Sequence, residues 1–173
     1  DAGRDLAALG RQFDVVFSNA CIQWIPDHPA LLPTMMERLR EGGVLAVQIP
    51  MNHEEPVHRI IGEVASREKW RRRLPDKRIF HQLRPEEYFR LLSRLSPSFE
   101  LWQTTYFHRL PSHEAILEWY RGTGLRPYLA LLTAEERVDF EGDILVELIR
   151  AYPREENGEI LFRFPRFFFL ARR

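Results

Sequence analysis

The stretch Phe13 to Asp27, FDVVFSNACIQWIPD, decides the fold. Its first six residues form a short, nearly continuous apolar run, which is typical of a parallel strand buried on both faces. Small and polar residues then interrupt this run. We therefore predict a strand over Phe13 to Ser18 that leads into a loop at Asn19 to Trp24. Loops at the carboxyl ends of parallel strands are where such sheets bind ligands.

A strand–helix–strand unit begins with this segment. Residues 29–40 carry leucines and methionines at helical spacing, and Gly42-Gly43 is expected to end that helix. The run GVLAVQIP predicts a second buried strand over Val44 to Ile49. This pattern indicates a right-handed βαβ crossover. A sheet that starts with a strand buried on both faces needs neighbours on both sides, so the chain looks like half of a Rossmann-like α/β sheet.

The rest of the chain continues the alternation of helices and strands. Proline and capping residues predict helices over 57–70, 85–95, 113–121, 126–132 and 133–152, the last with a capping-box spacing from Thr133 to Glu136. Aromatic and β-branched residues predict a strand over 99–110 and one or two strand segments from Ile160 onward, broken at Pro165. The expected order is β-α-β-α-α-β-α-α-α-β.

Composition excludes several functional classes. The 25 basic and 25 acidic residues cancel, which argues against nucleic-acid and anionic-membrane partners, and the cluster Arg71 to Arg73 is expected to be a solvated face. No apolar stretch approaches the roughly 20 residues of a membrane span. The single cysteine, Cys21, excludes an internal disulfide, is expected to be a small packing residue and suits the cytoplasm. The histidines show no metal-binding spacing, so no metal is expected.

Several motifs together resemble one enzyme family. FDVVFSNACIQWIPDH, GGVLAVQIPMN, TTYFHRLPSHEAILEW, GTGLRPYL and ENGEILFRFPRFFFLARR are similar to the trans-aconitate 2-methyltransferase family of S-adenosylmethionine-dependent methyltransferases. The resemblance covers nearly the whole chain. It implies the C-terminal portion of a Rossmann-like class I methyltransferase. The sheet would be mostly parallel, with the last strand antiparallel, and residues 112–152 would form a helical segment over the substrate site.

The chain departs from the family pattern in its cofactor-binding half. The family has a glycine-rich loop after its first strand and an acidic residue after its second, and the nine glycines here form no GxGxG. We therefore expect residues 1–173 to be a single incomplete domain, a truncated or processed fragment that begins at Asp1 without methionine and binds S-adenosyl-L-methionine poorly alone. Asp1 could match an acidic residue near the adenine.

The resemblance also assigns site residues. Asn19 and Ala20 would contact the cofactor, while Gln23 and Trp24 would contact the substrate. In the alternative interpretation, Ile22 and Trp24 anchor the core and Asn19 only forms a turn.

Substrate chemistry points to further contacts. A carboxylate is already ionised near neutral pH, so its methylation needs positioning and no catalytic base. A small polyanionic acid such as trans-aconitate would need cations, and Arg126 is the first choice, with a surface role as the alternative. Tyr106 and His108 share one face of their strand and could add donors, with a structural role as the preferred interpretation of His108, and Asn52 follows the second strand.

Three functions remain open at this point. The chain could be part of a small-acid methyltransferase, a fragment of a nicotinamide-dependent enzyme of the same fold class, or a catalytically silent α/β module. A silent module would associate with another chain, or with a second copy, through the exposed edge of its first strand.

Overall fold

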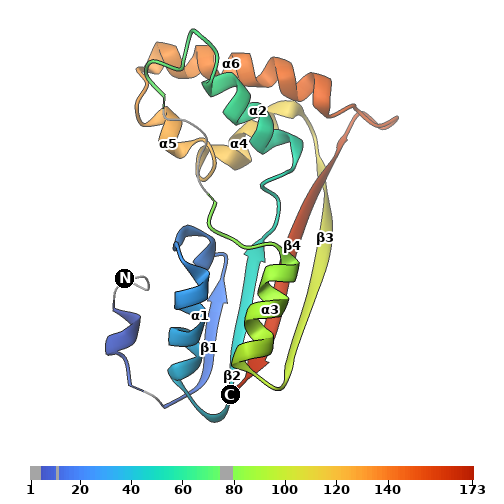
Figure 1. Ribbon diagram of the computed structural model, residues 1–173. Coiled ribbons are helices and arrows are strands. Elements are labelled where there is room, and N and C mark those ends of the chain that lie inside the picture. The colour runs from blue at the N-terminus through green and yellow to red at the C-terminus, as the bar shows by residue number, and fades with distance from the viewer. Residues whose placement is uncertain (1–4, 11, 75–79) are drawn as a thin grey trace. The chain divides into compact units, whose positions relative to one another are not determined.

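The computed structural model describes residues 5–10, 12–74 and 80–173 (Figure 1). Its strands are β1 (Phe13–Asn19), β2 (Leu39–Pro50), β3 (Phe99–Leu110) and β4 (Ile160–Arg172). Its helices are α1 (His28–Glu37), α2 (Pro56–Ala65), α3 (Pro85–Leu95), α4 (His113–Arg121), α5 (Arg126–Leu129) and α6 (Ala134–Ala151), with short 3-10 turns η1 (Leu6–Ala8) and η2 (Ile22–Trp24). The predicted order of strands and α-helices is confirmed.

The described residues form two compact units. Unit 1 contains the described residues up to 51, with 80–105 and 165–173, and unit 2 contains 52–74 with 106–164. Strands β3 and β4 therefore continue from one unit into the other.

The sheet has the order β1-β2-β4-β3. β1 pairs with β2 in parallel, and β4 pairs with β2 antiparallel, from Val44 opposite Arg172 to Pro50 opposite Arg166. The sheet is mixed, it is flanked by helices, and its last strand is antiparallel, as predicted.

One face of the sheet in unit 1 holds its core. Leu45, Val47 and Ile49 of β2 pack with Phe167 and Phe169 of β4 under the apolar sides of α1 and α3 (Figure 1). Both helices begin at well-defined caps. Asp27 accepts a hydrogen bond from the Ala30 backbone N–H at 3.2 Å, and α3 starts with a proline at its first turn.

The face of β1 that points away from the core is more exposed than the sequence predicts. Alternation along the strand points Val15 and Phe17 away from the core, where their side chains remain 55% and 70% exposed. The expectation of a strand buried on both faces is therefore wrong for this chain. The core of unit 1 lies on one face of the sheet, and among the described residues the side chains of Val15 and Phe17, on the other face, remain largely exposed.

Gly42 and Gly43 also play a role other than the predicted helix stop. α1 ends at Glu37, and both glycines lie inside β2. Gly42 has a positive φ of 74°, and a Cβ on Gly43 would lie 3.0 Å from the Phe13 carbonyl oxygen of β1. These glycines allow the irregular start of the β1–β2 pairing, where the register shifts between Phe13 and Val15.

Pro165 does not break β4, which is continuous from Ile160 to Arg172. Instead it ends the pairing with β2. The Met51 backbone N–H donates to the Pro165 carbonyl at 3.0 Å, and proline has no N–H to return the bond. The boundary between the two units falls at this residue.

Unit 2 packs helices α2, α4, α5 and α6 around buried aromatic residues that include Phe140 and Phe162. The predicted capping box is confirmed, because Glu136 N–H donates to Thr133 Oγ1 at 3.3 Å and Thr133 N–H donates to the Glu136 carboxylate at 3.0 Å. The segment after α2, predicted as helix to residue 70, consists of turns and bends over residues 66–74.

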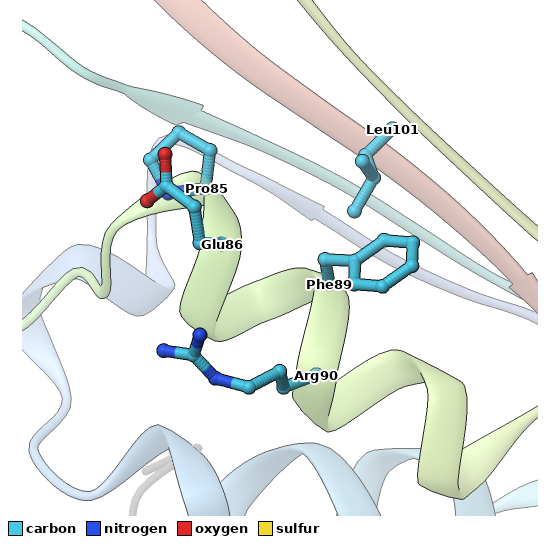
Figure 2. Close-up of a pocket in the computed structure, with 5 residues that line it drawn as sticks. All are labelled: Pro85, Glu86, Phe89, Arg90 and Leu101. Carbon is cyan, nitrogen blue, oxygen red and sulfur yellow. The ribbon is translucent and has the colours of Figure 1, made fainter.

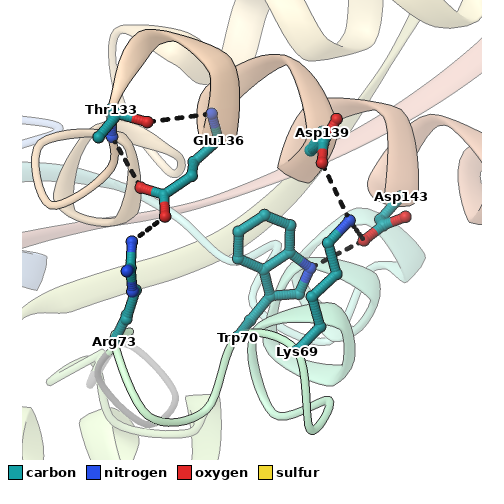
Figure 3. Close-up of polar contacts among 7 residues, drawn as sticks. All are labelled: Lys69, Trp70, Arg73, Thr133, Glu136, Asp139 and Asp143. Carbon is teal, nitrogen blue, oxygen red and sulfur yellow. Dashed lines mark hydrogen bonds and ion pairs between the residues drawn. The ribbon is translucent and has the colours of Figure 1, made fainter.

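Polar contacts tie this segment to α6. The Trp70 indole N–H donates to Asp143 Oδ2 at 2.8 Å, and Lys69 lies between Asp139 and Asp143 (Figure 3). The basic cluster Arg71 to Arg73 is exposed as expected, and Arg73 also pairs with Glu136. Among the helices in the described ranges, none combines the length and apolar character of a membrane span.

Candidate functional site

The loop after β1 turns sharply at Ala20. Asn19 ends the strand, and Ala20 has a left-handed φ of 50° while its N–H donates to the Gln48 carbonyl of β2 at 2.9 Å. A non-glycine residue in this conformation is uncommon and is often found at functional sites. The chain then enters η2, whose first residue, Ile22, is buried in the core of unit 1.

His28 fixes the position of this loop through two buried hydrogen bonds. Its Nε2 lies 2.8 Å from the Ile22 carbonyl oxygen, and its Nδ1 lies 2.6 Å from the Tyr88 hydroxyl. Since a carbonyl only accepts, we assign the proton to Nε2, and Nδ1 accepts from Tyr88. Burial lowers the pKa of His28, although the backbone carbonyl contacts oppose this effect, and burial raises the pKa of Tyr88.

The two predicted substrate contacts of the loop have different surroundings. Gln23 is buried, whereas Trp24 is 42% exposed and packs at a tilted angle against Phe80, with ring centroids 6.0 Å apart. Ile22 therefore anchors the core and Trp24 does not. Cys21 is exposed, so its predicted packing role is wrong. The turn at Ala20 to Ile22 carries its side chain out of the core.

Three buried polar atoms near the carboxyl ends of β1 and β2 have no hydrogen-bond partner among the described residues. They are Ser18 Oγ on β1, Gln48 Nε2 on β2 and Gln23 Oε1 in η2. Buried polar groups normally find a partner, so each of these atoms requires an explanation such as a bound group or water.

Sequence reasoning missed Gln48 and Arg166. Gln48 lies opposite Asn19 in the parallel β1–β2 pairing, and Arg166 of β4 donates to Gln48 Oε1 at 2.8 Å. A guanidinium therefore lies beside the strand end that carries the predicted cofactor contact. Gln48 and Arg166 are 118 positions apart in the sequence and lie on different strands. No local pattern in the sequence could therefore have indicated the pair.

In unit 2, Asn52 is buried and takes part in a polar cluster. Its Nδ2 donates to the Tyr120 hydroxyl at 3.2 Å, and His58 Nε2 lies 3.3 Å from the same oxygen. Nearby, the Val57 N–H donates to the Tyr152 hydroxyl at 3.2 Å. Burial raises the pKa of Tyr120, and it raises the pKa of Tyr152 to about 12. Both phenols therefore remain protonated at neutral pH.

Tyr106 and His108 share one face of β3, with stacked rings 6.2 Å apart. His108 is half-buried and packs edge-on against Trp119 at 4.7 Å, which supplies a structural role. Arg126 is the first residue of α5, and it is exposed.

The predicted site residues thus fall in two groups. Unit 1 contains Asn19, Ala20, Gln23 and Trp24, and unit 2 contains Asn52, Tyr106, His108 and Arg126. Asp1 lies outside the described residues. The helical segment 112–152 belongs to unit 2, and its covering role remains a prediction.

A separate hollow of about 460 Å³ opens on unit 1 and is lined by Pro85, Glu86, Phe89, Arg90 and Leu101 (Figure 2). It contains none of the predicted site residues. Within the described ranges, no group of three or more histidine, cysteine, aspartate or glutamate side chains could hold a metal ion.

Several relatives match over most of this chain. A trans-aconitate 2-methyltransferase from Escherichia coli O7:K1 (strain IAI39 / ExPEC) is 43% identical over 160 residues, and one from Klebsiella pneumoniae (strain 342) is 42% identical over 160 residues. Each match covers 92% of this chain. This chain is homologous to part of the trans-aconitate 2-methyltransferases. It spans 62% of the length of these trans-aconitate 2-methyltransferases, and no family model matches it.

Solved structures agree with this relationship at the level of the fold. The YcgJ protein from Bacillus subtilis matches with a TM-score of 0.54 at 14% identity, over 95% of this chain and 65% of that one. A candidate methyltransferase from Bacillus halodurans C-125 matches with a TM-score of 0.52 at 14% identity, over 99% of this chain and 68% of that one. The chain has the class I methyltransferase fold in the part that it covers, as its resemblance to the trans-aconitate 2-methyltransferases implied.

Proposed function

We propose that this chain is part of an S-adenosylmethionine-dependent methyltransferase that methylates a carboxylate of a small organic acid, with trans-aconitate as the first candidate. The observation that carries the proposal is the 43% identity to a trans-aconitate 2-methyltransferase over 92% of the chain. The loop geometry after β1 supports it. We place the enzyme in the cytoplasm, where its single cysteine would stay reduced.

The residues present fit one side of the cofactor. Ala20 carries only a methyl group at the left-handed turn, and the unpartnered Ser18 hydroxyl and Gln23 carbonyl oxygen could bond the polar groups of a ligand. The chain has no glycine-rich loop for the methionine moiety. This half-site suits cofactor binding in which another part of the polypeptide supplies the opposite wall.

The proposed roles of the protein groups are binding and orientation. S-adenosylmethionine supplies an electrophilic methyl group on a sulfonium when it is bound. Asn19 and Ala20 would border the cofactor, and Gln23 and Trp24 would orient the acid. No side chain needs to remove a proton from an acceptor that is already a carboxylate. Arg126, with Asn52, Tyr106 and His108, would bind the remaining carboxylates of the acid, because guanidinium groups pair with carboxylates in a bidentate manner.

A substitution tests the substrate assignment. In a full-length trans-aconitate 2-methyltransferase, replacing the residue equivalent to Arg126 by alanine is expected to raise KM for trans-aconitate by tenfold or more, since a charged hydrogen bond contributes about 1.5–3 kcal/mol. The equivalent change at Arg137, which instead donates to the Leu129 carbonyl at 2.8 Å, serves as the control. Unchanged KM at the Arg126 position would remove this residue from the site.

A silent module is the second candidate, and the open face of β1 favours it. Val15 and Phe17 are exposed there, and Trp102 stacks on Phe168 with ring centroids 5.1 Å apart. Apolar sheet faces and strand edges of this kind bind other polypeptide segments. Such a module would pair through β1 with another chain or a second copy.

Calorimetric titration with S-adenosylmethionine distinguishes the two functions. The chain alone is expected to bind the cofactor weakly. Addition of the part of the Escherichia coli relative that the chain does not match should raise the affinity at least tenfold under the enzyme proposal. An unchanged affinity in that mixture, with the two polypeptides shown to associate, would support the silent module.

A further inference from the structure

Helix α6 carries an apolar stripe on the side that faces away from its own core. Phe140, Ile144 and Leu148 point inward and are fully buried. On the opposite side, Val138, Val146 and Ile149 are 72%, 48% and 52% exposed. A surface helix normally places polar residues on that side. This stripe is therefore unusual for a helix whose outer face meets only water.

Gly142 lies in the middle of the stripe. Its exposed position has nothing within 4 Å of where a Cβ would be, so neither a close neighbour nor a positive φ requires glycine there. A glycine in the interior of a helix weakens the helix. The same residue, at the centre of an apolar stripe, would let a second helix approach the backbone closely.

We propose that this stripe, Val138, Gly142, Val146 and Ile149, is a dimerisation surface on which α6 packs antiparallel against α6 of a second copy, with the two helices crossing at Gly142. This inference is independent of the proposed methyltransferase activity. The chain alone supplies both halves of such an interface, since a two-fold axis pairs a patch with itself.

The positions along the helix fit this arrangement. Val138 and Val146 lie four residues before and four residues after Gly142. An antiparallel crossing at Gly142 therefore sets Val138 of one copy at the level of Val146 of the other. The apolar residues would meet on both sides of the crossing, and the glycine would lie at the point of closest approach.

Charge selects the antiparallel orientation and the identical partner. Glu135 lies seven residues before Gly142, at the N-terminal end of the stripe, and Arg150 lies eight after it, beside the stripe, and both are exposed. An antiparallel pair places each Glu135 at the level of the partner copy's arginine, twice by symmetry. A parallel pair would instead bring glutamate beside glutamate and arginine beside arginine, which is unfavourable. Arg150 is also held by Glu147 at 3.1 Å.

The proposed interface between the two α6 helices is small. α6 has 18 residues and a length of about 27 Å at 1.5 Å per residue, so one helix pair lies at the low end of specific interfaces, below about 1,200 Å². We therefore expect a weak, reversible dimer with a dissociation constant on the order of 100 µM.

Cysteine cross-linking tests the crossing point and the orientation. In a Cys21→Ser background, Gly142→Cys is expected to form a disulfide-linked dimer under mild oxidation, because at the crossing point the Cα atoms of the same residue in the two copies come within about 7 Å. A mixture of Val138→Cys and Val146→Cys chains should cross-link to each other more than either does to itself. Leu161→Cys, at an exposed apolar position on β4, serves as the matched control. Cross-linking at residue 142 no faster than at residue 161 would overturn the proposal.

Sedimentation over about 5–500 µM protein tests the energetics. Val138→Asp should weaken the dimer at least tenfold, while Leu161→Asp should leave it unchanged. Glu135→Arg and Arg150→Glu should each weaken the dimer, and the combined variant should restore it, which a mere loss of folding would not do. Circular dichroism checks that each variant is folded. A monomer at every concentration, or a dimer that neither Val138→Asp nor the charge reversals affect, would contradict the proposal.

Discussion

Replacing His28 by leucine tests how the loop after β1 is held. The change removes two buried hydrogen bonds, one to the Ile22 carbonyl at 2.8 Å and one to the Tyr88 hydroxyl at 2.6 Å. Each partner keeps another bond, from the Ile25 N–H at 2.9 Å and from the Leu83 N–H at 3.3 Å. The Ile22 carbonyl stays paired, at a loss of about 0.5–1.5 kcal/mol, but the buried Tyr88 O–H loses its acceptor, which costs about 1–3 kcal/mol, so the expected loss is about 2–4 kcal/mol of unfolding free energy.

The stability difference between the parent chain and this variant should also depend on pH. The folded-state pKa of His28 lies below its unfolded value of 6.5, chiefly because of burial. The unfolded chain therefore binds the proton more readily. The stability that the neutral histidine contributes is fully present above pH 6.5 and is lost as pH falls towards the folded pKa, by at most about 1.4 kcal/mol per pH unit. Asp27 favours the charged form and His81 opposes it, and neither reverses the shift.

Urea denaturation at pH 7.5 and pH 5 measures both effects, with hydrogen exchange of the β1 and β2 amides to localise them. The difference in stability between the parent chain and His28→Leu should shrink at pH 5, because only the parent loses stability there. Tyr88→Phe is the matched control: it removes the phenol's bond to His28 and its bond from the Leu83 N–H, at a cost of about 1–3 kcal/mol, and it keeps the titrating histidine, so its stability should still fall at pH 5. A His28→Leu chain within about 0.5 kcal/mol of the parent at pH 7.5 would refute the reasoning, as would an equal difference at both pH values.

Three further substitutions probe unit 2. Trp70→Phe removes the 2.8 Å bond to Asp143 and should cost about 1 kcal/mol in urea denaturation, whereas no loss would mean that solvent replaces this bond (Figure 3). Gly124→Ala would place a Cβ 2.6 Å from the Tyr120 ring, so we expect a loss of about 1–3 kcal/mol, and an unchanged melting temperature would contradict the packing described. Tyr120→Phe leaves the buried Asn52 amide without its phenol partner, and thermal unfolding should show a loss of about 1–2 kcal/mol. A neutral result there would indicate that another group pairs with the amide.

Local signals in the sequence predicted much of the secondary structure. The bounds of β3 and α4 agree with the prediction, and the capping box at Thr133 starts α6 where expected. Each of these signals acts within one turn or one strand. Gly42 and Gly43 misled the prediction because a glycine pair that can end a helix can equally allow a distorted strand start.

Features that depend on residues far apart in the sequence could not be predicted from local patterns. The apolar residues of β1 predicted burial, but whether a face is covered depends on what packs against it, and Phe17 remains exposed. The Arg166–Gln48 contact depends on the antiparallel β2–β4 register. Cys21 is exposed because of the turn at Ala20. The predicted roles of Asn19, Gln23 and Arg126 came from the resemblance to a family, and they remain predictions.

The most direct test of the central claim is methylation of trans-aconitate. The chain is joined to the part of the Escherichia coli relative that it does not match, and methyl transfer from S-adenosylmethionine is measured by mass spectrometry of the product. The proposal predicts a methyl ester of trans-aconitate from the joined protein. A folded joined protein that binds S-adenosylmethionine and methylates neither trans-aconitate nor another small carboxylic acid would contradict it.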